Sequence, residues 1–466
     1  MHIAVIGTGY VGLVSGACFA EFGNTVVCVD SDRNKIEKIN SGEMPIYEPG
    51  LEALVARNVQ ARRLEFTTDI KRAIESSLVI MLAVGTPPSS DGSADLSQIE
   101  AVALEIASSL NGYKVIVTKS TVPVGASGFI KAIIEKNKGS NYRYSVASNP
   151  EFLREGAAIN DFMRPDRVVI GCRDEEGIEI LKDLYRPLYL IETPFVVTNP
   201  ESAEMIKYAS NAFLATKISF INEIANLCDL LGADVRDVAK GMGMDKRIGG
   251  KFLHPGPGFG GSCFPKDVKA LAALARSNNY EMKLTDAVLD VNEKQTASII
   301  DRVKRAVPNL AGKTVAVLGL AFKPETDDMR EAPSLKIISD LLSAGAKVRV
   351  YDPAAMTAAR RMLSDVTFCE DEYDAATSSN AIVVVTEWNQ FRGLDFERLR
   401  KLMTELNIVD LRNIYNPADI RKAGFNYASI GRPGDMANAR REENADLSGM
   451  FLSEDFLAAP TMSLNS

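Results

Sequence analysis

The sequence predicts an α/β protein with two Rossmann-like, doubly wound parallel-sheet domains, joined by a long central helix and a further helical region. An apolar run followed by a glycine turn at 2–12 is echoed at 313–323, which predicts two related sheets. The unbroken helical pattern of 201–232 predicts the connecting helix. We expect four regions: an N-terminal NAD-binding domain over 1–198, a central helical domain over 199–300, a second Rossmann-like domain over 301–435, and a polar, mobile tail over 436–466.

Composition excludes several classes of function. The net charge of −8 provides no basic patch for nucleic acid, and no apolar stretch is long enough to cross a bilayer, so we expect neither partner. The six cysteines are widely and irregularly spaced, which predicts no metal site and no disulfide framework. A reducing cytoplasm is the expected location, and no segment at the N-terminus has the pattern of a targeting signal.

The N-terminal motif predicts a dinucleotide site. The buried-strand pattern of 2–7 is followed at once by a glycine turn and a helix of small residues, and a second apolar run ends on Asp30. A carboxylate at that distance binds the ribose hydroxyls and repels a 2′-phosphate, so NAD is expected rather than NADP. Lys35 lies close enough in sequence to contact the cofactor. The turn residues expected at the cofactor are Gly7, Gly9, Tyr10, Val11 and Gly12.

Further apolar runs predict the rest of the first sheet, at 78–84, 114–120, 143–148 and 167–171. Ligands of such sheets bind at the carboxyl ends of the strands, where the chain carries 85–88, 120–125 and 149–156. Within the last of these, Glu151 and Glu155 are spaced one helical turn apart and are expected to face one cleft.

The central helix carries Lys207 and Asn211 at a spacing of four residues, among small neighbours. That spacing places both on one helix face, where an ammonium and an amide can donate to a developing alkoxide.

The glycine-dense loop 258–267 places Cys263 before a predicted helix. Glycines allow close approach to the sulfur, and a helix N-terminus is expected to lower the thiol pKa, so the pattern predicts a nucleophile. Asp267 falls one turn further on the same side. Since there are only two histidines, a general base must come from Lys, Asp, Glu or water, unless His254 serves; its place in a Pro- and Gly-rich stretch indicates a structural role.

The second half repeats the strand and turn at 313–323 and a strand ending on an acid at 346–352, with more strands at 381–386 and 407–412. Its turn lacks the full glycine pattern, so a nucleotide there is expected to make different contacts.

The ten residues of 258–267, together with 85–88, 120–125 and 149–156, resemble the active-site segments of the UDP-glucose dehydrogenase family, and the match covers most of the chain up to the tail. The resemblance implies NAD-dependent, four-electron oxidation of UDP-glucose to UDP-glucuronate through a thiohemiacetal and a thioester on Cys263. It also implies a homodimer formed through the central helix, with Arg247 reaching the partner's site. GDP-mannose or another nucleotide sugar is the alternative substrate.

The resemblance also assigns residues to roles. Catalytic roles fall on Cys263, Lys207, Asn211, Asp267, Thr121 and Glu151. Further cofactor contacts fall on Thr86, Thr121, Glu155, Lys266 and Arg330. Substrate contacts fall on Glu151, Phe152, Leu153, Lys207, Asn211, Arg247, Phe252, Leu253, Gly260, Lys323 and Arg412, with the uracil and diphosphate expected at the second half.

Two other functions are compatible with parts of the pattern. A two-electron hydroxyacid dehydrogenase, similar to the 6-phosphogluconate dehydrogenase group, shares the first domain and the Lys-x-x-x-Asn pair but needs neither Cys263 nor a second nucleotide-binding half. A non-enzymatic NAD or sugar-nucleotide sensor would need none of the matched catalytic positions.

Overall fold

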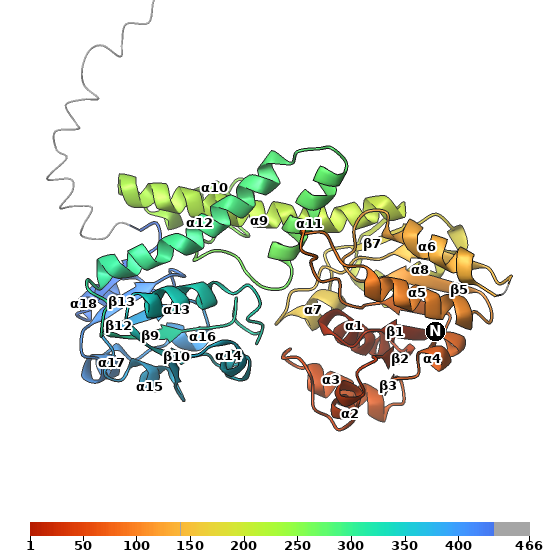
Figure 1. The fold of residues 1–466 in the computed structure, drawn as a ribbon, viewed down its shortest axis with the longest axis horizontal. Helices are drawn as coiled ribbons and strands as arrows, with labels where there is room; N and C mark the ends of the chain where they lie inside the picture. The colour runs from red at the N-terminus through yellow and green to blue at the C-terminus, as the bar shows by residue number, and fades with distance from the viewer. Residues whose placement is uncertain (140, 433–466) are drawn as a thin grey trace, which may run out of the picture.

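The computed structural model describes residues 1–139 and 141–432, and the expected tail 436–466 lies outside them. Two sheet domains lie at opposite ends of a layer of long helices that runs across both (Figure 1). The predicted fold class is confirmed: the two sheets have the order β3-β2-β1-β4-β5-β6-β7-β8 and β11-β10-β9-β12-β13-β14.

The first sheet is parallel throughout except where β7 pairs antiparallel with β6. Its strands are β1 His2–Ile6, β2 Thr25–Val29, β3 Leu64–Thr67, β4 Val79–Leu82, β5 Lys114–Thr118, β6 Tyr144–Ser148, β7 Val168–Cys172 and β8 Phe195–Thr198. Its helices are α1 Tyr10–Glu21, α2 Arg33–Asn40, α3 Leu51–Gln60, α4 Ile70–Ser76, α5 Ser97–Ser109, α6 Ala126–Asn137, α7 Ala158–Met163 and α8 Glu175–Leu184, followed by the 3-10 helix η1 Arg186–Ile191.

The central layer is built on α9, which spans Pro200–Leu231 and confirms the predicted helix. Asn199 caps its start by accepting a hydrogen bond from the Ser202 N–H, and Gly232 ends it in the left-handed region at φ 74°. The helices packed with it are α10 Val235–Gly243, α11 Phe264–Ser277 and α12 Lys283–Ala306.

The second sheet is wholly parallel. Its strands are β9 Thr314–Leu318, β10 Lys347–Tyr351, β11 Val366–Phe368, β12 Ala381–Val384, β13 Asn407–Asp410 and β14 Asn426–Ser429. Its helices are α13 Pro333–Ser343, α14 Met356–Met362, α15 Glu372–Ala376, α16 Asn389–Arg392, α17 Phe396–Leu402 and α18 Pro417–Lys422.

The four strands that the apolar runs did not predict are β3, β8, β11 and β14, and each is the outermost strand of its sheet. An edge strand is covered on fewer sides, so its sequence is not a continuous apolar run. The four residues of β8, for example, are all exposed or half-buried, whereas all four of β4 are buried.

The segment that carries Glu151 and Glu155 is a loop between β6 and α7, so the expectation that a helical turn aligns them is wrong. Pro150 precedes Glu151 and lacks the N–H that a helix would use, and α7 begins only at Ala158. The two carboxylates nevertheless line the same cavity.

Candidate functional site

The turn between β1 and α1 leaves room for a phosphate group. Gly7 adopts φ +103°, and a Cβ there would stand 2.6 Å from the Ala83 carbonyl oxygen, so only glycine fits. Gly12 is equally constrained, because its Cβ would stand 1.9 Å from the Gly7 oxygen. Gly9 faces open space, and as the N-cap of α1 it makes no side-chain capping bond. The first N–H groups of α1, which include those of Tyr10 and Val11, therefore suit a pyrophosphate.

Asp30 lies beside this turn. Its Oδ2 accepts hydrogen bonds from the Thr8 N–H at 2.9 Å, the Thr8 hydroxyl at 2.8 Å and Lys35 Nζ at 2.8 Å. Burial alone would raise the pKa of Asp30, but Lys35 and the N–H donors outweigh it and hold the pKa at about 2. The carboxylate is thus ionised at neutral pH, and the turn, Asp30 and the start of α1 together fit NAD.

A cavity of about 940 Å³ opens beside the β6–α7 loop, α9 and the cysteine loop. It also reaches Lys323 and Glu387 of the second sheet domain. Ten residues that the sequence analysis singled out line it: Glu151, Phe152, Leu153, Glu155, Lys207, Asn211, Phe252, Gly260, Cys263 and Lys323.

Cys263 lies at the N-cap of α11, as the sequence predicted. The glycines before it are forced by close packing: a Cβ on Gly261 would meet the Phe322 ring at 2.7 Å, and one on Gly260 would meet the Glu331 oxygen at 2.2 Å. The loop is therefore pressed against the second sheet domain and holds the thiol at the cavity wall.

The expected lowering of the Cys263 pKa is wrong for the free protein. Burial raises the pKa of the thiol to about 11; Lys207 opposes that rise, while Glu151 and Asp267 add to it. The group is thus a neutral thiol at rest, and its reactivity depends on the charges around it.

Lys207 and Glu151 form a buried ion pair across the cavity, with Nζ 3.0 Å from Oε1 and both side chains 5% exposed. Burial, the largest influence, lowers the pKa of Lys207, but Glu151, the Cys263 sulfur and Asp267 together raise it above the ordinary value. The ammonium therefore stays charged beside the thiol.

Asn211 and Asp267 make the second buried contact. The Asn211 amide donates to Asp267 Oδ2 at 2.6 Å, while Lys266 Nζ donates to Asp267 Oδ1 at 2.7 Å. The Asp267 N–H bonds to the Cys263 carbonyl at 2.9 Å, so this carboxylate lies one helical turn from the thiol.

Glu155 and Arg330 meet where the two sheet domains approach each other. Glu155 accepts hydrogen bonds from Ser262 at 3.1 Å and Thr326 at 3.0 Å, and Arg330 lies 3.8 Å from it. Burial and the nearby Asp328 raise the pKa of Glu155.

At the strand ends of the first sheet, the Thr86 hydroxyl donates to the Thr121 carbonyl at 2.8 Å, which joins these two residues near the cofactor turn.

Three expected substrate residues do not line the cavity of the described chain. Arg247 is 89% exposed and pairs with Asp245. Leu253 is buried in the core beneath the second sheet. Arg412 bonds to the carbonyls of Val385 and Phe322 and lies 3.0 Å from Glu387.

The second sheet domain uses its Rossmann-like acid differently. Asp352 is fully buried and accepts bonds from the Leu320 and Ala321 N–H groups and from the Trp388 indole. A Cβ on Gly319 would stand 2.4 Å from Thr386. Both the acid and the turn are therefore occupied by the protein itself, which agrees with the expectation that a nucleotide makes other contacts here.

Two polar residues at this site were not predicted from the sequence. Lys119 lines the cavity with its ammonium bonded to Asn149 at 3.1 Å and Tyr185 at 3.0 Å, and burial lowers its pKa to about 8. Its position just after β5 could have indicated a role, because ligands of such sheets bind at the carboxyl ends of the strands. Ser262 lies 3.6 Å from the Cys263 sulfur, and nothing in its residue type indicated that contact.

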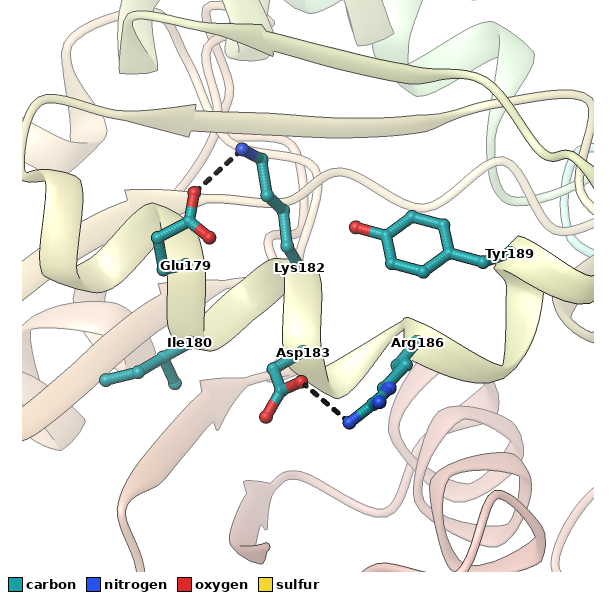
Figure 2. A pocket seen from close by; sticks show the side chains of 6 residues that line it. All are labelled: Glu179, Ile180, Lys182, Asp183, Arg186 and Tyr189. Carbon is teal, nitrogen blue, oxygen red and sulfur yellow. Dashed lines mark hydrogen bonds and ion pairs between the residues drawn. The ribbon is translucent and has the colours of Figure 1, made fainter.

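A smaller hollow of about 380 Å³ lies over α8 and η1 (Figure 2). Its side chains form two solvent-exposed ion pairs, Lys182 with Glu179 and Arg186 with Asp183. It contains no thiol and no buried charged pair, so the cavity at Cys263 is the candidate site.

In the part of the chain that the structure describes, no group of three His, Cys, Asp or Glu side chains could hold a metal ion. Within the same ranges, every helix is too short or too polar to cross a membrane.

Comparisons with known proteins agree with this geometry along most of the chain. Three parts of the UDP-glucose/GDP-mannose dehydrogenase family match: the NAD binding domain at residues 1–189, the central domain at 201–294 and the UDP binding domain at 316–417. A UDP-glucose 6-dehydrogenase of Rhizobium meliloti is 52% identical over 93% of this chain and 100% of its own length. UDP-glucose 6-dehydrogenase TuaD of Bacillus subtilis is 50% identical over 92% of this chain and 93% of its own length. The solved structure of a UDP-glucose dehydrogenase from Pyrobaculum islandicum is 40% identical and superposes with a TM-score of 0.85 over 92% of this chain and 97% of that one.

Proposed function

The chain belongs to the UDP-glucose/GDP-mannose dehydrogenase family, and we propose that it oxidises the 6-hydroxymethyl group of UDP-glucose to the carboxylate of UDP-glucuronate. NAD is its cofactor and accepts one hydride in each of two steps. The observation that carries the proposal is that Cys263 lines one cavity together with Lys207, Asn211 and Glu151.

The first step transfers a hydride from carbon 6 to NAD and releases the proton of the hydroxyl to water, which leaves an aldehyde. Asp30, the glycine turn and the start of α1 bind the cofactor beside the cavity. The buried Lys207 ammonium stabilises the negative charge that develops on the sugar oxygen.

Cys263 then retains the aldehyde. The thiol gives up its proton to water, its sulfur bonds to carbon 6, and the carbonyl oxygen becomes the alkoxide of a thiohemiacetal. Lys207 and Asn211 project from one face of α9 and donate to that oxygen. Loss of a second hydride from the same carbon gives the thioester.

Hydrolysis completes the sequence. Water adds to the thioester carbon, the carbon–sulfur bond breaks, and the leaving sulfur takes up a proton, which restores the resting thiol of Cys263. Asp267, one turn from the sulfur, positions this water together with Thr121, and Glu151 accepts a proton from it. In the free protein, Asp267 accepts a hydrogen bond from the Asn211 amide and Glu151 accepts one from the Lys207 ammonium.

The substrate class is tested by comparing NADH production with UDP-glucose, UDP-galactose, GDP-mannose and UDP-N-acetylglucosamine. We expect UDP-glucose to give the highest kcat/KM. A higher kcat/KM with GDP-mannose or a UDP-N-acetyl sugar would reassign the enzyme within its family.

We also propose a homodimer formed through α9. This helix exposes Phe213, Phe220 and Leu227 at intervals of seven residues, and Leu230 and Leu231 near its end, with exposed fractions of 45–75%. Intervals of seven place these side chains on one helix face. Burial of that face against a second copy would bring the exposed Arg247 towards the partner's sugar nucleotide.

We also propose that the enzyme works in the cytoplasm, and the state of the cysteines supports this. All six are free thiols in the structure, five of them buried, and free thiols persist in a reducing compartment.

A further inference from the structure

Glu48 is a buried carboxylate that the mechanism above does not use. It precedes α3 and is 7% exposed. Its Oε2 accepts a hydrogen bond from the Gly156 N–H at 2.6 Å, and its Oε1 accepts from the N–H groups of Ala158 at 2.8 Å and Ile159 at 3.4 Å. The Tyr10 hydroxyl also donates to Oε2. Both oxygens are therefore engaged with donors.

These donors come from two functional segments. Tyr10 is the first residue of α1 and follows the glycine turn of the cofactor site. Gly156 follows Glu155 in the loop that lines the substrate cavity, and its N–H also lies 3.0 Å from the Tyr10 hydroxyl oxygen. One carboxylate thus joins the cofactor turn to the substrate loop.

The same loop continues to the nucleophile. Glu155 Oε1 accepts from the Ser262 hydroxyl at 3.1 Å, and that hydroxyl lies 3.6 Å from Cys263 Sγ. An unbroken series of contacts therefore runs from Tyr10 through Glu48, Gly156 and Glu155 to the thiol.

The loop has little freedom to shift on its own. Gly156 adopts φ +80°, and a Cβ there would stand 2.4 Å from the Glu325 carbonyl oxygen of the second sheet domain. Gly156 is therefore packed closely against that segment on one side and held by its N–H bond to Glu48 on the other.

We propose that Glu48 is a positioning residue that fixes Gly156 against the cofactor turn, and thereby holds Glu155 and Ser262 at the Cys263 thiol. The inference rests on the proposed function, in which Cys263 is the nucleophile. A carboxylate is required because all its partners are donors: an amide would turn its NH2 group towards some of these donors and leave them unpaired.

The test compares the wild type with Glu48→Gln, and uses Glu52→Gln, the same change at an exposed site four residues away, as the control. Alkylation of Cys263 by iodoacetamide is followed by mass spectrometry between about pH 7 and pH 12, a range that extends above the wild-type midpoint, without sugar or cofactor. The other five cysteines are buried and react less. Melting curves establish that each variant is folded, and kcat and KM are measured in parallel.

The Ser262 hydrogen bond lowers the pKa of the thiol, so its loss in Glu48→Gln moves the midpoint of alkylation to higher pH. We expect kcat to fall about tenfold or more, the effect of losing hydrogen bonds to a charged group, while Glu52→Gln behaves as wild type. A lowered melting temperature with an unchanged midpoint and kcat would show that Glu48 only caps α7, and would overturn the proposal.

A second variant keeps the test decisive if Glu48→Gln does not fold. Tyr10→Phe removes one hydroxyl from the same network and keeps the ring. It should move the alkylation midpoint in the same direction by a smaller amount, and a wild-type midpoint would overturn the proposal. Because alkylation needs no substrate, a wild type that fails to oxidise UDP-glucose contradicts the proposed function separately.

Discussion

Lys207 Nζ lies 3.0 Å from Glu151 Oε1, and the pair is closed off from solvent at the wall of the cavity that contains the thiol. The two charges act on Cys263 in opposite directions, because Lys207 lowers the pKa of the thiol and Glu151 raises it. Burial raises this pKa most, and the balance between the two charges then increases or decreases the fraction of thiolate available for reaction.

Removal of the ammonium should abolish most of the activity. Lys207→Ala takes away a donor to the alkoxide of the thiohemiacetal, and the loss of one such donor lowers kcat by about 10²–10³-fold. We expect the variant to fold and to bind NAD, since the cofactor turn is formed by other elements. Lys294→Ala, on an exposed pair of α12, is the matched control. Near-normal turnover in Lys207→Ala would refute the role of this lysine.

Opposite shifts of the thiol titration are expected from the two partners. Lys207→Met should move the alkylation midpoint of Cys263 above its value of about 11, because the cation that favours thiolate is gone. Glu151→Gln should move it lower, because a carboxylate that disfavours thiolate is neutralised. The measurement is the pH dependence of iodoacetamide modification. Shifts of the same sign in both variants would contradict the electrostatic account.

Cofactor selectivity should depend on Asp30. Asp30→Asn removes the charge that disfavours a 2′-phosphate, so we expect the ratio of kcat/KM for NAD over NADP to fall by about tenfold or more. The pKa of about 2 lies below the ordinary value for aspartate of about 3.9. The stability that Asp30 contributes is therefore present above about pH 4 and is lost as the pH falls towards 2. An unchanged ratio of kcat/KM for NAD over NADP would show that Asp30 does not contact the cofactor.

The oligomeric state should respond to the exposed face of α9. Leu227→Lys combined with Leu231→Lys places two charges in the proposed interface, and light scattering after size exclusion should then report a monomer. Leu104→Lys on α5 has a similarly exposed leucine and serves as control. The monomer should also lose activity to an extent comparable with Arg247→Ala. A dimer that survives both charges would place the interface elsewhere.

Much of the fold follows from the sequence for a physical reason. Strands buried on both faces, such as β1 and β4, are continuous apolar runs, and α9 has clear start and stop residues in Asn199 and Gly232. Edge strands such as β8 lack that signal because tertiary pairing, and not burial, defines them.

The residues of the site also fall into those that the sequence predicts and those that only the structure reveals. Cys263, Lys207 and Asn211 were predictable because their chemistry and local spacing coincide. The contact between Glu48 and Gly156 was not, because 108 residues separate them and neither is unusual in its local context. The direction of the Cys263 pKa shift was also missed, since burial depends on how the second sheet domain packs over the loop, and it outweighs the helix terminus.

The central claim is that one thiol retains the aldehyde between two hydride transfers, and the NADH formed per mole of UDP-glucose consumed tests it most directly. The wild type should give two NADH per sugar, whereas Cys263→Ser should stall at or before the thioester stage. One NADH per sugar in both proteins would contradict the account and indicate a two-electron dehydrogenase.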